Sequence, residues 1–149
     1  MTHQIKLNIY DLSQGLASQF SPMILGFHIK AIYHTSITIF NQEWYFNSQG
    51  IQRSIPYQTH FGKPIEIRDM GTTEIPLEIF EEFIQDLPRF QSGKYELWEN
   101  NCNDFTKTVM EFLNDFNDFD DEIYGLSRRV LNSEKGEMLR QLMTGMIVD

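Results

Sequence analysis

The fold is decided by the stretch IYHTSITIF, residues 32–40. It is rich in β-branched and aromatic residues, which favour extended backbone because their side chains fit the pleated surface of a sheet. Successive side chains on a strand point to opposite faces, so His34 and Ser36 share one face while Ile37 points the other way. The stretch therefore predicts a strand with one apolar face and one face that carries a histidine.

Similar patterns recur on both sides of this strand. Apolar and polar residues predict further extended segments over 5–10, 43–46, 50–56, 65–70 and 95–98, with a turn at 41–42 and a loop over 11–22. Apolar residues at helical spacing predict helices over 77–87, from Cys102 onward, and over 121–131 and 134–143. This order of elements predicts an α+β fold, a small antiparallel sheet packed with helices, in one domain spanning residues 1–149.

Composition narrows the class of protein. The 12 basic and 21 acidic residues give a formal charge of −9, which argues against a nucleic-acid partner because phosphate backbones would repel the chain. The start lacks a secretory signal, and no apolar run is long enough to span a membrane. The single cysteine allows no internal disulfide. We therefore expect a soluble protein of the cytoplasm, with the nucleus also open to it.

Cys102 is the first candidate for chemistry. It opens the predicted helix, with Asn101 as N-cap and Phe105 and Val109 at helical spacing behind it. First-turn amides and the helix dipole stabilise a thiolate, so this position predicts a thiol pKa below its ordinary value. The same amides point to where a tetrahedral oxyanion would form. The alternative is inert packing, since free cysteine is among the most buried residue types.

A cysteine nucleophile needs a proton acceptor, and histidine titrates in the right range. The chain has four histidines: His3, His28, His34 and His60. Only His34 lies on a predicted strand, and we expect it on the face that the Cys102 helix covers. The alternative is a sheet histidine satisfied by a neighbour. Nothing in the spacing of histidines and carboxylates predicts a metal site, no phosphate-binding glycine motif is present, and we expect no cofactor.

Several passages resemble the PPPDE peptidases, a permuted papain-fold group that includes the desumoylating isopeptidases. The passages are YDLSQG (10–15), SP (21–22) with LG (25–26), YHTSI (33–37), GI (50–51), GTTE (71–74) and NCNDF (101–105), in the same order as in the family. The resemblance covers roughly residues 5 to 140. It implies a papain-like site in inverted order, with histidine first on a strand and cysteine later on a helix. In that family the catalytic pair falls on His34 and Cys102.

The resemblance leaves other parts of the site open. The family members most similar to this chain carry histidine just before the Asn-Cys pair, where this chain has Asn100. Asn101, Asn103 and Glu99 are candidates to orient the imidazole or to donate to the oxyanion, and Asn101 is alternatively a plain helix cap. Trp98 and Tyr33 are candidates to wall a substrate groove, and the alternative for both is core packing.

The resemblance implies a thiol isopeptidase that removes a ubiquitin-like modifier, SUMO or ubiquitin, from proteins by way of a Cys-His dyad. An alternative reading uses the same dyad on another bond, in a protein S-acyl thioesterase (depalmitoylase) or in a lipid acyltransferase like the lecithin retinol acyltransferase group. A third is a non-catalytic binding module. The expected partners are proteins conjugated to a ubiquitin-like modifier, without nucleic acid or membrane span, and a homodimer is compatible with the sequence.

Overall fold

The computed structural model describes residues 1–96, 99–115, 121–131 and 133. Its centre is a five-stranded antiparallel sheet in the order β4-β3-β2-β1-β5. The elements in chain order are β1 (His3–Asp11), α1 (Leu16–Leu25), β2 (Tyr33–Ile39), β3 (Gln42–Asn47), β4 (Gly50–Ser54), β5 (Glu66–Thr73), α2 (Leu77–Gln85), η1 (Pro88–Phe90), α3 (Cys102–Asn114), α4 (Asp121–Tyr124) and α5 (Leu126–Leu131). The predicted α+β class and small antiparallel sheet are confirmed.

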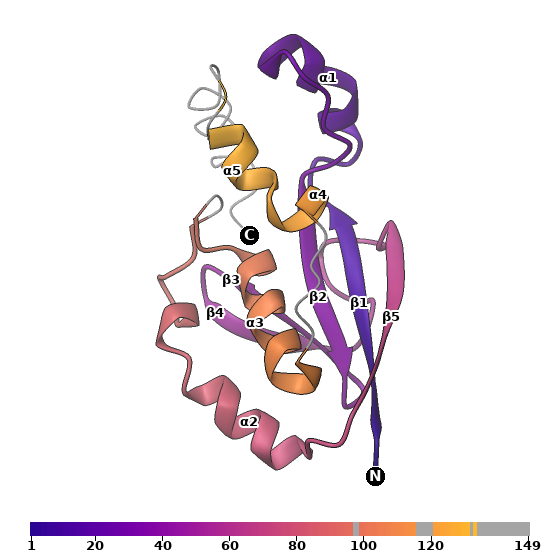
Figure 1. Ribbon diagram of the computed structural model, residues 1–149, viewed down its shortest axis with the longest axis vertical. Helices are drawn as coiled ribbons and strands as arrows, with labels where there is room; N and C mark the ends of the chain where they lie inside the picture. Colours follow the sequence, from indigo (N-terminus) through magenta and orange to yellow (C-terminus); the bar gives the residue numbers. More distant parts are fainter. Residues whose placement is uncertain (97–98, 116–120, 132, 134–149) are drawn as a thin grey trace.

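Helix α3 lies across one face of the sheet and forms the main core with it (Figure 1). Its Phe105 and Val109 are fully buried against Ile37 of β2. The apolar side chains of residues 105, 109 and 113 lie on one helical face, and burying each of them stabilises the fold by roughly 2 kcal/mol. α2 closes the lower end of this core, where Phe80 packs edge-on against Trp44.

The opposite face of the sheet is polar but also covered. Asn8 on β1 donates to the hydroxyls of Ser36 and Thr38 on β2. Glu43 on β3 is fully buried there. The segment 55–65 lies over this face, because β4 and β5 occupy opposite edges of the sheet and the chain between them has to cross it.

Several predicted elements differ from the structure; β4 ends at Ser54 and α2 at Gln85, each two residues earlier than predicted. Residues 16–25 form α1 where a loop was expected: Ser13 accepts from the Ala17 N–H near its start, and Pro22 is tolerated inside it. The β2–β3 turn lies one residue earlier, at Phe40 and Asn41, which both have positive φ as a tight type I′ hairpin turn requires. β5 continues through the Gly71 region instead of ending at Met70, aided by an irregularity opposite residues 4–6 of β1.

The helices after α3 are shorter than predicted. The predicted helix over 121–131 is broken at Gly125 into α4 and α5. The helix predicted over 134–143 lies outside the described residues. In the part of the chain that the structure describes, no helix is long and apolar enough to cross a membrane.

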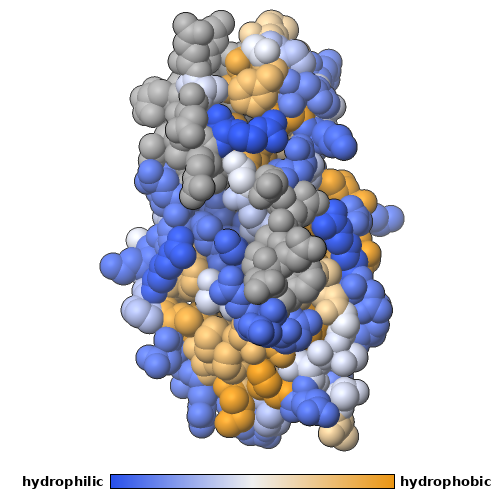
Figure 2. All heavy atoms as spheres, viewed as in Figure 1, coloured by the Kyte–Doolittle hydropathy of each residue, from blue (hydrophilic) through white to orange (hydrophobic). Residues whose placement is uncertain are grey.

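Apolar side chains gather on the surface where α2 meets the C-terminal half of α3 (Figure 2). Phe83 of α2 and Phe112 of α3 stack there with ring centroids 3.8 Å apart. Ile79, also on α2, is 46% exposed. This stacked pair joins the two helices at the end of the fold away from Cys102.

Candidate active site

Helix α3 begins at Cys102 because the residues around it form a complete N-terminal cap. The Asn101 side chain accepts from the backbone N–H groups of Asn103 and Asp104, at 2.9 and 3.2 Å. Asp104 in turn accepts from the Asn101 N–H at 3.0 Å. Such a reciprocal capping box satisfies donors that the first helical turn leaves unpaired. The predicted N-cap is therefore confirmed, and it fixes the thiol in the first turn.

Asn103 attaches this first turn to strand β2. Its side-chain oxygen accepts from the Thr35 hydroxyl at 2.7 Å, and its side-chain nitrogen donates to the Tyr33 carbonyl at 3.1 Å. The same oxygen accepts from the Cys102 thiol at 3.8 Å. Asn103 thus links the thiol to the strand that carries His34.

The Cys102 sulfur is buried, with only 1% of the residue exposed. Burial raises the pKa of the thiol to about 12. The nearby backbone N–H groups of Thr35, Asn103 and Cys102 itself act in the opposite direction and lower the pKa, while the Asp104 carboxylate adds to the rise. The predicted low thiol pKa is therefore wrong, because the loss of water around the buried thiol outweighs the effect of the helix terminus.

His34 lies in an aromatic cage on the polar face of the sheet and is 2% exposed. Phe61 stacks on its ring at 3.8 Å, with Tyr10 at 5.6 Å and Tyr45 at 6.0 Å between ring centroids. Burial, and then the nearby charge of His60, lower the pKa of His34 to about 3. His34 is therefore a neutral imidazole, and its Nε2 has no hydrogen-bond partner among the described residues.

The expected arrangement of the two side chains is wrong in one respect. α3 packs on the face of β2 that carries Thr35 and Ile37, whereas the His34 ring lies among residues of the other face. The sulfur lies close to the strand itself, because the backbone N–H of Thr35 is among the groups that lower the pKa of the thiol. That nitrogen lies about 2.4 Å from the His34 Cα along the chain. The thiol therefore lies beside the backbone of the strand that carries His34, with the imidazole on the other face, and the dyad stays a prediction.

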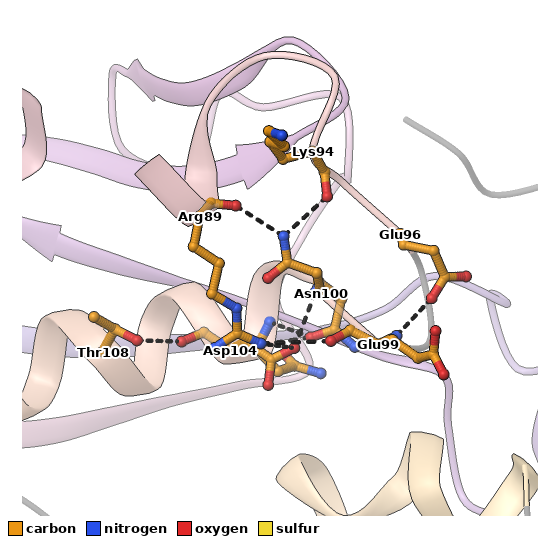
Figure 3. A network of polar contacts seen from close by, with 9 residues as sticks. Arg89, Lys94, Glu96, Glu99, Asn100, Asp104 and Thr108 are labelled. Carbon is orange, nitrogen blue, oxygen red and sulfur yellow. Dashed lines mark hydrogen bonds and ion pairs between the residues drawn. The ribbon is translucent and has the colours of Figure 1, made fainter. Parts of the chain in front are cut away.

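The loop before Cys102 is held by Asn100, the position where the chain departs from the family pattern (Figure 3). Its side-chain nitrogen donates to the carbonyls of Arg89 and Lys94, at 2.8 and 2.9 Å. Backbone hydrogen bonds between Glu96 and Asn100 close the loop. Arg89 adds an ion pair with Asp104 at 3.8 Å, between an exposed and a half-buried side chain. Asn100 therefore fixes the approach to the helix without touching the thiol.

The remaining predicted residues are placed as follows. Asn101 acts as a helix cap, and Glu99 contributes its backbone, accepting from Arg89 and donating to Glu96. Tyr33 lines a cavity of about 590 Å³ between β1, β5 and α4, which neither Cys102 nor His34 lines. Trp98 lies outside the described residues. The roles of Asn101, Asn103 and Glu99 toward the imidazole or oxyanion, and of Tyr33 as a groove wall, stay predictions.

Sequence reasoning missed Phe61 and Glu43. Glu43 accepts from the hydroxyls of Tyr10 and Ser36 and from the backbone N–H of Tyr57, the last at 2.8 Å. A glutamate inside an apolar strand, facing the same side as His34, was the available signal for this buried network. The residues around Phe61 gave no signal for this role, because only the path of segment 55–65 over the sheet brings Phe61 to His34.

Comparison with known proteins adds to this geometry. Residues 3–144 match the family described as "PPPDE putative peptidase domain". The chain is 36% identical over 143 residues to desumoylating isopeptidase 1 of Xenopus laevis, and 38% identical to the proteins of that name from Homo sapiens and Rattus norvegicus. Each alignment covers 95% of this chain and 84% of the relative. A match of this extent means that the chain belongs to the PPPDE peptidase family.

Proposed function

We propose that this protein is a cysteine isopeptidase that removes a SUMO-like modifier from proteins, with Cys102 as nucleophile and His34 as general base. The observation that carries the proposal is the placement of the Cys102 sulfur. It lies in the first turn of α3, which the Asn103 side chain attaches to the strand that holds His34. The names of the relatives, desumoylating isopeptidase 1, support the choice of modifier.

The reaction has two halves that this pair of residues supports. The imidazole takes the thiol proton while the sulfur bonds to the carbonyl carbon of the modifier's last glycine. The tetrahedral intermediate collapses, the imidazolium protonates the departing lysine amine, and a thioester remains on Cys102. Water, losing a proton to the imidazole, then hydrolyses the thioester and restores the thiol.

The oxyanion of each intermediate needs donors beside the sulfur. The backbone N–H groups of Thr35 and Cys102 lie near the sulfur and favour negative charge there, whereas the Asn103 N–H also donates to the Asn101 side chain at 2.9 Å. The oxyanion forms on the carbon that bonds to the sulfur, so donors near the sulfur also favour its negative charge. Asn103 orients the thiol through its contacts with Thr35 and Tyr33.

In this structure both groups are uncharged, because burial raises the pKa of Cys102 and lowers that of His34. Proton transfer between them is therefore unfavourable until the site opens. Nε2 of His34 has no partner in the described residues, so the ring has an unused nitrogen to turn toward the sulfur. A resting site of this kind avoids reacting with stray electrophiles before substrate binds.

The decisive experiment compares three substrates side by side: a SUMO fusion, a ubiquitin fusion and a palmitoyl-peptide analogue. We expect hydrolysis of the SUMO fusion, with activity lost in Cys102→Ala and in His34→Leu. His28→Gln is the matched control, since His28 is an exposed histidine bonded to Ser18. Hydrolysis of the palmitoyl analogue alone would replace the isopeptidase by a thioesterase, and no hydrolysis at all would favour a binding module.

A further inference from the structure

The segment 55–65 covers His34 as a consequence of topology. β4 and β5 are the two edges of the sheet, so the chain that joins them has to pass over β3, β2 and β1. It takes the polar face, since α3 fills the other one. Its far end is tied to β1 by a hydrogen bond of 2.7 Å from the Ile65 N–H to the Ile9 carbonyl.

Contacts along the segment lead to the imidazole. The Tyr57 N–H donates to the buried Glu43 carboxylate at 2.8 Å, which fixes the near end. Phe61 then contacts three rings of the sheet: its centroid lies 3.8 Å from His34, 5.4 Å from Tyr45 and 5.8 Å from Tyr10. Its plane is 29° from that of the imidazole, so the two rings are stacked.

This stack is the outer wall of the cage around His34. Tyr10 and Tyr45 belong to strands β1 and β3 and cannot leave the sheet without breaking it. Phe61 belongs to a connection, is itself half-buried, and is followed by Gly62 at φ 83°. Of these three rings, Phe61 is the one that can move while the sheet stays intact.

We propose that Phe61 is a positioning residue that holds the His34 imidazole in its closed orientation and keeps water from it. The inference rests on the proposed function, in which His34 is the base. Displacing Phe61 admits water and frees the imidazole to turn toward Cys102. The residue thus sets when His34 acts, through its contact with the ring.

The groups that face His34 decide how it titrates once it is uncovered. Tyr10 from β1, Glu43 and Tyr45 from β3, and His60 from the covering segment surround it. Burial keeps the pKa of both tyrosines above its ordinary value, so they stay neutral near pH 7. The nearby charge of His60 opposes a charged imidazole. Removal of the Phe61 ring should therefore raise the pKa of His34 toward about 6.5, chiefly by restoring water.

The test follows the imidazole by NMR in wild type, Phe61→Ala and Phe61→Tyr, with His34→Leu to assign the signal. The wild-type His34 should not titrate between pH 8 and pH 5. Phe61→Ala should make it titrate in that range, and Phe61→Tyr, which keeps the ring, should restore the wild-type behaviour. The matched control is Phe83→Ala, which removes an equivalent 3.8 Å stack on Phe112 and should leave His34 unchanged.

A second readout uses the pH dependence of kcat/KM on the SUMO fusion. Its acid limb should move to higher pH in Phe61→Ala and stay in place in Phe83→Ala. An unchanged His34 titration in folded Phe61→Ala would overturn the inference, and so would the same change in Phe83→Ala. The NMR titration needs no turnover, so it decides the inference even if the chain cleaves no modifier and the proposed function fails.

Discussion

The buried neutral His34 should make the protein lose stability in mild acid. The pKa of His34 is about 3 when folded and about 6.5 when unfolded. Between these values the unfolded chain binds one proton that the folded chain does not. The free energy of unfolding therefore falls as pH drops below about 6.5. Above that pH the imidazole is neutral in both the folded and the unfolded chain, and no stability is lost.

The size of the effect follows from the two pKa values. Proton linkage gives a loss of about 2 kcal/mol between pH 8 and pH 5, with a limiting slope of about 1.4 kcal/mol per pH unit. Solvent screens this effect very little, because His34 is 2% exposed. A domain of this size has a total stability of roughly 5–15 kcal/mol, so the loss is readily measured.

Urea unfolding at pH 8, 7, 6 and 5 tests this in wild type, His34→Leu and His28→Gln. Leucine is apolar, and Nε2 of His34 has no partner in the described structure to lose. The difference in unfolding free energy between wild type and His34→Leu should change by about 2 kcal/mol over the series. His28→Gln should follow the wild type. Parallel curves for wild type and His34→Leu would refute a buried neutral His34.

Three further outcomes are expected. Glu43→Leu leaves the Tyr10 and Ser36 hydroxyls and the Tyr57 N–H without their acceptor and should cost at least about 3 kcal/mol by urea unfolding, whereas Glu43→Gln should cost about 1 kcal/mol. Equal losses of unfolding free energy in the two variants would contradict this hydrogen-bond network around Glu43. Iodoacetamide should alkylate Cys102 more slowly than free cysteine at pH 7.5, at a rate rising about tenfold per pH unit to pH 9; a rate flat from pH 6 to 8 would contradict the high thiol pKa. Asn100→Ala removes two hydrogen bonds to carbonyls and should lower the unfolding free energy by about 1–2 kcal/mol, and an unchanged midpoint would contradict the loop's dependence on it.

Local patterns were enough to predict most of the sheet and the start of α3. β2 and the Asn101 cap depend on residues adjacent in sequence, and both are found where they were expected. α1 was missed because Ser21 and Pro22 suggested a loop, while the contacts that fix it include one from the Ile29 N–H to the Ser21 hydroxyl.

The site was harder to predict because it also depends on contacts between residues far apart in the sequence. The positions of His34 and Cys102 follow from short motifs, but their protonation depends on which segments exclude water from them. Phe61 covers His34 only because β4 and β5 lie at opposite edges of the sheet. Helix-terminus effects on Cys102 are local and were foreseen, whereas the larger effect of burial on its pKa is not visible in the neighbouring residues.

The pairing of β1 with β5 has a consequence for the order of folding. β2, β3 and β4 are joined by tight turns, while Leu7 pairs with Arg68, far away in the chain. Contacts of long sequence separation form late because loop closure costs entropy, so we expect the β2–β4 meander first and β5 last. Pulsed hydrogen exchange during refolding should show protection of β3 amides before those of β5. The imidazole then stays exposed to water until β5 docks, so the cage around His34 forms in the last step of folding.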